Sequence, residues 1–315
     1  MDGTMLLKDK IKTTLTRLKN GNWQCMCPQC TDNAIKSHVF QKSSILEPIA
    51  NNGKLYNLHY DIFHGTSKGL ANYEERGIKD TDFTFKGFCE KHDNTIFAPI
   101  EKGDMIDWCQ PISQYLLSYR SLCRELYVNR LVSSIIDEHI ERLYSIDFCA
   151  RYAVIQNNIE LLESNKNAFE RSISIGDFSH YSFETIVLPF KFELCLSSPI
   201  VVHNDCVPLY FVNIFPYRNK TIIIIGNLSN VMSVWGNRIL SQLKSNDHSQ
   251  ISLAIMDIIH RGEFHCMSYS LYNSIQDLPK FLGEWNQNIQ RFDLELKYTN
   301  IFDDIIKNLI DKNMY

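Results

Sequence analysis

Two short pairs of metal-binding residues are the feature of this chain that points most directly to chemistry. Cys27 and Cys30 lie in the segment CPQC, and Cys89 and His92 lie in the segment CEKH. A two-residue spacer lets one turn present two ligands to the same ion, and three cysteines with one histidine suit the tetrahedral coordination of Zn²⁺. We therefore expect one structural zinc ion, with Cys27, Cys30, Cys89 and His92 as its ligands.

A neighbouring cysteine, Cys25, competes for the first ligand position. We favour Cys27 because only Cys27 has the two-residue spacing to Cys30. The alternative to a metal site is a chance match in a chain with ten cysteines. The start of the chain lacks the pattern of a secretory signal, so we expect a reducing cytoplasm, where clustered cysteines bind metal and do not form disulfides.

The elements expected around these pairs would place them on a turn and at the start of a helix. The spacing of apolar residues predicts a helix over 4–19, and strands are expected over 34–40 and 54–60. Residues 61–82 are polar without a clear period and are expected to form a loop. A helix should begin at the second pair and stop near Pro99.

This order of elements resembles the zinc-binding treble-clef nucleases of the HNH class, over about residues 20–105. In that family a Cys-x-x-Cys pair precedes a ββα unit. A histidine near the end of its first strand acts as general base, and a residue at the start of the helix binds a catalytic divalent metal. The resemblance implies that His38 is the base, and that Asp93, directly after the last zinc ligand, helps to bind Mg²⁺ or Mn²⁺.

Two positions depart from the pattern of the family. An acidic residue usually precedes the histidine and helps to bind the metal, and here that residue is Ser37. The asparagine that usually comes before the second metal pair falls near Thr84. These departures favour an alternative, in which His38 is a hydrogen-bonded, half-buried side chain and Asp93 only interacts favourably with the helix dipole.

The charge of the chain limits how it could meet nucleic acid. The net charge is −4 and the pI is near 6.2, which argues against a uniformly basic surface. Binding would depend on a local patch, and four lysines flank the proposed site. They are Lys36, Lys42, Lys86 and Lys91. Further along, the spacing of Arg120 and Arg124 indicates a surface ladder with Glu125.

The rest of the chain predicts an α+β protein. Apolar residues recur at helical spacing over 111–170, and Gly176 marks the best candidate for a linker. Beyond it, runs rich in Val, Ile and Phe predict an antiparallel sheet, with a hairpin turn at 217–220 and helices over 230–244, 249–260 and 298–312. We expect three domains: a zinc-binding HNH-like, treble-clef-like module (1–105), a helical block (106–175) and an α+β domain (176–315).

Two functional hypotheses follow. The first is a metal-dependent, HNH-like nuclease, which by analogy would act in microbial defence. The second is a non-catalytic zinc module that binds nucleic acid or a protein partner. The domain over 176–315 could bind a protein partner or a second copy of the chain. The most apolar run, KTIIIIGNL, is too short to cross a bilayer, so we expect no membrane association and a cytoplasmic location.

Overall fold

An antiparallel sheet of seven strands is the centre of the fold. The computed structural model describes residues 3–60, 71–101, 106–143, 146–202, 205–231, 233–283 and 300–313. The strands are β2 (Lys54–Tyr60), β3 (Ala71–Gly77), β5 (Tyr181–Leu188), β6 (Leu194–Ile200), β7 (Tyr210–Tyr217), β8 (Lys220–Leu228) and β9 (His265–Met267). Their order across the sheet is β3-β2-β9-β6-β7-β8-β5. The mixed helix and antiparallel-sheet architecture agrees with the α+β expectation.

The hairpin of β7 and β8 forms the apolar middle of this sheet. Tyr217 pairs with Lys220, so the predicted turn at 217–220 is confirmed. The run of four isoleucines in β8 divides between two cores, because successive side chains of a strand point to opposite faces. Ile222 and Ile224 pack into one core, and Ile223 and Ile225 into the other. Both faces of the strand are covered, which explains its continuous apolar sequence.

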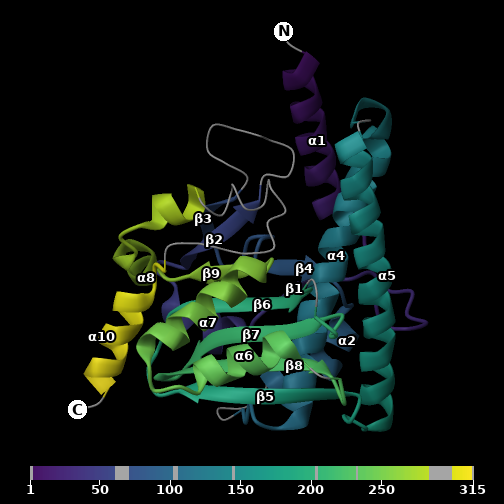
Figure 1. Cartoon of the computed structure of the whole chain (residues 1–315). Coiled ribbons are helices and arrows are strands. Elements are labelled where there is room, and N and C mark those ends of the chain that lie inside the picture. The colour runs from purple at the N-terminus through teal and green to yellow at the C-terminus, as the bar shows by residue number, and fades with distance from the viewer. Residues whose placement is uncertain are drawn as a thin grey trace.

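Helices cover the two faces of the sheet. The predicted helical block forms α4 (Pro111–Leu143) and α5 (Ile146–Ile175), and α4 packs with the first core together with α1 (Gly3–Asn20). The second core lies under α6 (Val234–Leu243), α7 (His248–Arg261), α8 (Tyr269–Ser274) and α10 (Asp303–Asn313). Figure 1 shows α6 and α7 in front of the sheet, with α4 and α5 at the right. Every helix among the described residues is too short or too polar to span a bilayer.

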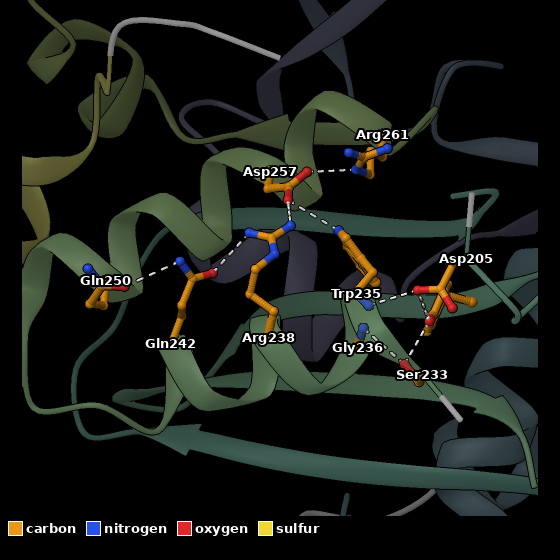
Figure 2. Close-up of polar contacts among 10 residues, drawn as sticks. Asp205, Ser233, Trp235, Gly236, Arg238, Gln242, Gln250, Asp257 and Arg261 are labelled. Carbon is orange, nitrogen blue, oxygen red and sulfur yellow. Dashed lines mark hydrogen bonds and ion pairs between the residues drawn. The ribbon is translucent and has the colours of Figure 1, made fainter. Parts of the chain in front are cut away.

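A network of polar side chains joins α6 to α7 (Figure 2). Asp257 of α7 accepts hydrogen bonds from Arg238 and from the indole Nε1 of Trp235, at 3.2 Å for the indole. The Nε atom of Arg261, one turn further along α7, lies 2.6 Å from the same carboxylate. The hydroxyl of Ser233 caps the start of α6 by accepting from the N–H of Gly236. This network fixes the two helices against each other.

A second, two-stranded sheet lies in the N-terminal part. It consists of β1 (Lys36–His38) and β4 (Thr84–Lys86), and α2 (Glu90–Ile96) and α3 (Ala98–Glu101) follow it. A π-helical turn (Lys42–Leu46) and a 3-10 turn (Glu47–Ile49) follow β1. This small unit packs on α4 through an aromatic group: Phe88, Phe97 and Tyr119. Strands β2 and β3 of the large sheet lie between β1 and β4 along the chain.

The large sheet crosses the boundaries expected from the sequence. Residues 61–82 were expected to form a loop, yet the part over 71–77 is strand β3, while 61–70 lies outside the described residues. Strands β2 and β3 extend the C-terminal sheet because Tyr56 pairs with Met267 of β9. The first core contains side chains from all three expected segments, among them Ile11, Tyr115 and Cys266. The large sheet and the first core thus include residues on both sides of the boundaries expected at residues 105 and 175.

Candidate metal centre and adjacent polar cluster

Four side chains of the N-terminal unit converge into a cluster with the donor set of a metal site. Their ligand atoms all lie within 4.8 Å of one another, and the residues are Cys25, Cys30, Cys89 and His92. The Nδ1 atom of His92 lies 3.4 Å from Sγ of Cys25 and 3.2 Å from Sγ of Cys89. The edges of a tetrahedron with zinc bonds of about 2.0–2.3 Å measure roughly 3.3–3.8 Å. This cluster could bind a structural metal such as zinc.

Backbone hydrogen bonds position the two halves of this metal cluster. The N–H of Met26 donates to the carbonyl of Gly87 at 2.7 Å, and the N–H of Ile35 donates to that of Phe88 at 2.7 Å. The first cysteine turn is thereby held against the end of β4. Cys89 is the residue that precedes α2, and His92 lies in the first turn of that helix. The second pair of ligands therefore opens a helix, as the sequence predicted.

The first ligand position corrects the sequence prediction. Cys25, and not Cys27, belongs to the four converging side chains. The carbonyl of Cys27 accepts the N–H of Cys30 at 3.1 Å, which closes a tight turn. Cys25 is buried, whereas Cys27 is only half-buried. Spacing identified two of the three cysteines and the histidine, and the third cysteine was the competitor noted in the sequence.

His38 lies at the end of β1, directly opposite Thr84 of β4. Its Nε2 atom is 3.1 Å from the carbonyl oxygen of Ile78. A carbonyl only accepts hydrogen bonds, so Nε2 carries the proton and the neutral ring keeps a lone pair on Nδ1. Burial lowers the pKa of His38 below its ordinary value, and the charges of Lys42 and Arg120 add to this effect. The ring is therefore neutral near pH 7 and able to accept a proton.

Asp93 lies in the first turn of α2, next to the metal cluster. Burial raises the pKa of its carboxyl group above the ordinary value, and Arg120 and the Ser37 hydroxyl offset this effect only in part. The nearest cation is the guanidinium of Arg120, whose Nη2 atom is 4.0 Å from Oδ1 of Asp93. Among the described residues, Oδ1 has no hydrogen-bond partner.

Arg120 is the residue of this region that the sequence prediction missed. It was expected on a surface ladder with Glu125, but its side chain is only 1% exposed, and Arg124 makes the ion pair with Glu125 instead. Its Nη2 atom lies 2.7 Å from Oε1 of Glu101, and its guanidinium stacks over the ring of Phe97 at 4.0 Å. We call His38, Asp93, Glu101 and Arg120 the polar cluster. No local pattern in α4 could have shown that Arg120 meets residues of α2 and α3.

The polar cluster does not fit the second, catalytic ion that the resemblance implied. The metal cluster is the one place in the described ranges where three or more His, Cys or acidic side chains converge within ligand distance. A divalent ion beside Asp93 would also lie next to the buried guanidinium of Arg120. Like charges that close in a buried site repel strongly. The expected Mg²⁺ or Mn²⁺ therefore has no matching set of donors around Asp93.

The four lysines expected to bind substrate have different surroundings. Lys36 and Lys86 are partners across the β1–β4 ladder, and the ammonium of Lys86 donates to the carbonyls of Asn20 and Gly21. Lys42 lies 2.9 Å from Glu47. Lys36 and Lys91 are exposed. The structure thus brings Lys36 and Lys86 together but engages Lys86 and Lys42 in local contacts.

The two positions that depart from the family pattern are both buried. Ser37 is 2% exposed and Thr84 is 7% exposed. Neither supplies a carboxylate to the polar cluster. Comparisons of the chain with protein families, with curated proteins and with solved structures found no match.

Proposed function

We propose that this protein hydrolyses phosphodiester bonds of nucleic acid, with His38 as the general base. The observation that carries the proposal is the contact between Nε2 of His38 and the carbonyl of Ile78. This contact fixes the tautomer with a free lone pair on Nδ1, and the lowered pKa keeps that lone pair available near pH 7. A base with these properties could remove a proton from the water that attacks phosphorus.

The architecture around His38 supports this proposal. β1 pairs with β4 and α2 follows β4, with His38 at the end of β1 and Asp93 at the start of the helix, although β2 and β3 lie between β1 and β4 along the chain. The metal cluster lies where it would hold the first turn of α2 against the strands, which favours a treble-clef-like arrangement. Zinc bound there would be structural, because all four of its ligands would come from the protein.

A specific observation favours the second function, a non-catalytic zinc module that binds nucleic acid or a protein partner. Arg120 lies where a catalytic cation would be needed, and it is held by Glu101 at 2.7 Å and by the ring of Phe97. A buried cation held in this way is typical of a structural ion pair. The two functions therefore make opposite predictions for one assay.

The assay incubates the purified protein with plasmid DNA and with RNA, in parallel samples with Mg²⁺, with Mn²⁺ and with neither ion. Cleavage by the wild type should fall by roughly 10²- to 10⁴-fold in a His38→Ala variant, the usual contribution of a general base. His59→Ala is the matched control, because His59 is a half-buried histidine of β2 outside the polar cluster. Its activity should remain that of the wild type.

Zinc content and thermal stability are measured on each variant, so that a folding defect is recognised. Undiminished cleavage by His38→Ala would remove His38 from the mechanism. If the wild type cleaves none of the nucleic acids under any of the ion conditions, the non-catalytic module becomes the better assignment.

A further inference from the structure

The turn that carries Cys27 and Cys30 adds one more cysteine at the edge of the metal cluster. The cluster contains Cys25, Cys30, Cys89 and His92 and leaves Cys27 outside. Cys27 and Cys30 are half-buried, whereas Cys25 and Cys89 are buried. The two cysteines that an oxidant in solution reaches first are therefore one member of the cluster and one cysteine outside it.

The geometry of the CPQC turn brings these two cysteines close together. The N–H of Cys30 donates to the carbonyl of Cys27 at 3.1 Å and closes the turn. Pro28 is its second residue, and Gln29, its third, has a φ of 62°. These are features of a type II turn, whose first and last Cα atoms lie less than about 7 Å apart. A disulfide bond needs a Cα separation below about 7 Å, so the separation of Cys27 and Cys30 permits one.

Hydrogen bonds outside the metal cluster hold the base of this turn. Gln24 pairs with Asn33 in an isolated bridge, and the side-chain amide of Gln24 donates to the carbonyl of Cys30 at 2.8 Å. The N–H of Cys25 donates to the carbonyl of Asp32 at 2.9 Å. The chain itself thus ties the ends of the turn together, and the turn does not depend on a metal ion alone.

We propose that Cys27 and Cys30 form a redox modification site, in which oxidation to a disulfide removes Cys30 from the metal cluster. A cysteine binds zinc as a thiolate, and a sulfur that is part of a disulfide is no longer a thiolate. The sulfur of Cys30 therefore has two competing partners, zinc and Cys27. The proposal depends on the metal cluster and not on the proposed hydrolysis of nucleic acid.

Hydrogen peroxide is an oxidant of the required class, because it converts a thiolate to a sulfenic acid. The thiolate of Cys30 attacks one peroxide oxygen, so that an S–O bond forms and the O–O bond breaks with departure of hydroxide. The sulfur of Cys27 then attacks the sulfenic sulfur and forms the S–S bond. The sulfenic hydroxyl group leaves with the thiol proton of Cys27 as water. The two sulfur atoms together lose two electrons, and the peroxide is reduced to one water molecule and one hydroxide ion.

The disulfide would change the part of the chain that carries Asp93. Without Cys30 the cluster keeps Cys89, which precedes α2, His92 in the first turn of α2, and Cys25. Three ligands hold a structural zinc ion less tightly than four, so oxidation should release the ion and loosen the start of α2. A thiol reductant restores both thiols, and the turn then presents Cys30 to the metal again. A disulfide of this kind is transient in a reducing environment, which is typical of a redox sensor.

The test treats the purified, zinc-containing protein with hydrogen peroxide in the presence of a chelator that changes colour when it binds zinc. Differential alkylation and mass spectrometry identify the oxidised cysteines. The wild type should release about one equivalent of zinc, as a single four-ligand site requires. Its disulfide should join Cys27 to Cys30, Cys25 and Cys89 should remain free thiols, and dithiothreitol followed by added zinc should restore the metal.

Cys27→Ser removes the partner of Cys30 and leaves the four members of the cluster in place. Its Cys30 should proceed to the sulfinic acid, which thiols do not reduce, so the oxidised variant should regain at least about fivefold less zinc than the wild type does. Cys109→Ser is the matched control, because Cys109 is an exposed cysteine outside the cluster. It should release and regain zinc as the wild type does. Circular dichroism before oxidation checks that both variants are folded.

Four results would overturn the proposal. They are a wild type purified without zinc, a wild-type disulfide that joins Cys30 to Cys25 or Cys89, retention of zinc by the protein with the Cys27–Cys30 disulfide, and full recovery of zinc by oxidised Cys27→Ser. Cleavage of nucleic acid is not among these measurements, so failure of the proposed function would leave the redox site standing, and failure of the redox site would leave the proposed function standing.

Discussion

Asp257 and Asp93 are both largely buried, both lie on a helix and both face arginine, yet their pKa values shift in opposite directions. The side chain of Asp257 is 12% exposed and that of Asp93 is 15% exposed, so burial alone does not distinguish them. Burial raises the pKa of Asp257, but Arg261 and Arg238 outweigh this effect, and its pKa lies below the ordinary value. For Asp93 the effect of burial prevails and the pKa lies above it.

The partners of the two carboxylates explain this difference. Asp257 accepts hydrogen bonds from two arginines and from the indole of Trp235, as Figure 2 shows. Asp93 faces one guanidinium at 4.0 Å, and its Oδ1 atom has no hydrogen-bond partner among the described residues. A buried polar network with every member satisfied stabilises a fold, whereas an unsatisfied buried atom needs another explanation, such as a bound ligand or a catalytic role. The comparison therefore separates a satisfied carboxylate, Asp257, from one with an unsatisfied buried oxygen, Asp93.

The largest effect is expected from removal of a ligand of the metal cluster, because zinc bound there would hold the first turn of α2, the helix of Asp93. Structural zinc contributes about 10–16 kcal/mol to the folding of small zinc domains. Cys25→Ser should remove about one equivalent of zinc and accelerate amide hydrogen exchange in α2, while exchange in α7, the helix of Asp257, should change little. Elemental analysis and hydrogen-exchange mass spectrometry measure the two quantities.

Cys27→Ser is the control for this prediction, because Cys27 lies in the same turn but outside the converging set. It should retain the metal and the exchange pattern of the wild type. Loss of zinc from Cys27→Ser with retention in Cys25→Ser would reverse the ligand assignment.

Substitution of Asp257 should have the next largest effect. Asp257→Asn leaves two arginines and an indole N–H facing an amide, and removal of one partner of a buried ion pair costs about 3–5 kcal/mol. We expect about 2–4 kcal/mol, because Arg238 is half-exposed and can turn to water. Urea unfolding gives the value. Asp311→Asn, an exposed substitution on α10, should stay within about 0.5 kcal/mol of the wild type.

The elements around Asp257 were predictable from the sequence, and the strand pairing across the molecule was not. Runs of β-branched residues indicated β7 and β8, and helical spacing indicated α4 and α7. Strand β3 was missed because its polar sequence, ANYEERG, belongs to an edge strand, which has solvent on one side. The contact of β2 with β9 joins residues about 200 positions apart, and no local pattern records such a pairing.

Prediction from the sequence has the same limit at the metal cluster and at the polar cluster. The spacing of the two pairs showed that Cys30, Cys89 and His92 belong together, because ligand spacing is a local property of one turn. The choice between Cys25 and Cys27 depended on the path of the backbone through that turn. Arg120 reaches the polar cluster only through the packing of α4 against α2 and α3, which is a tertiary feature.

Asp93 should contribute little to stability, in contrast to Asp257. In an Asp93→Asn variant, Arg120 keeps its closer partner Glu101, so the free energy of unfolding should change by less than about 1 kcal/mol. If the proposed function holds, cleavage of nucleic acid should nevertheless fall at least about tenfold, because the carboxylate interacts electrostatically with His38. Glu101→Gln weakens the 2.7 Å contact and should destabilise the protein more than Asp93→Asn does. A loss of 3 kcal/mol or more in Asp93→Asn would make Asp93 a structural residue like Asp257.

The smallest effect is the pH dependence of the Asp257 network, and its sign follows from the lowered pKa. An aspartate in an unfolded chain has a pKa near 3.9. Because the folded pKa of Asp257 lies below that value, its ionic contribution is complete above the unfolded pKa and is lost as the pH falls through the folded pKa. The difference in unfolding free energy between wild type and Asp257→Asn should therefore be constant above about pH 5. Below about pH 4 it should shrink, by at most about 1.4 kcal/mol per pH unit for one group.

Urea unfolding of both proteins from pH 7 to pH 3 measures this difference. Since protonated aspartate and asparagine are both neutral, whatever difference remains at pH 3 reports packing and hydrogen bonding. A difference that grows as the pH falls would contradict the stabilising ion pairs on which the contrast with Asp93 depends.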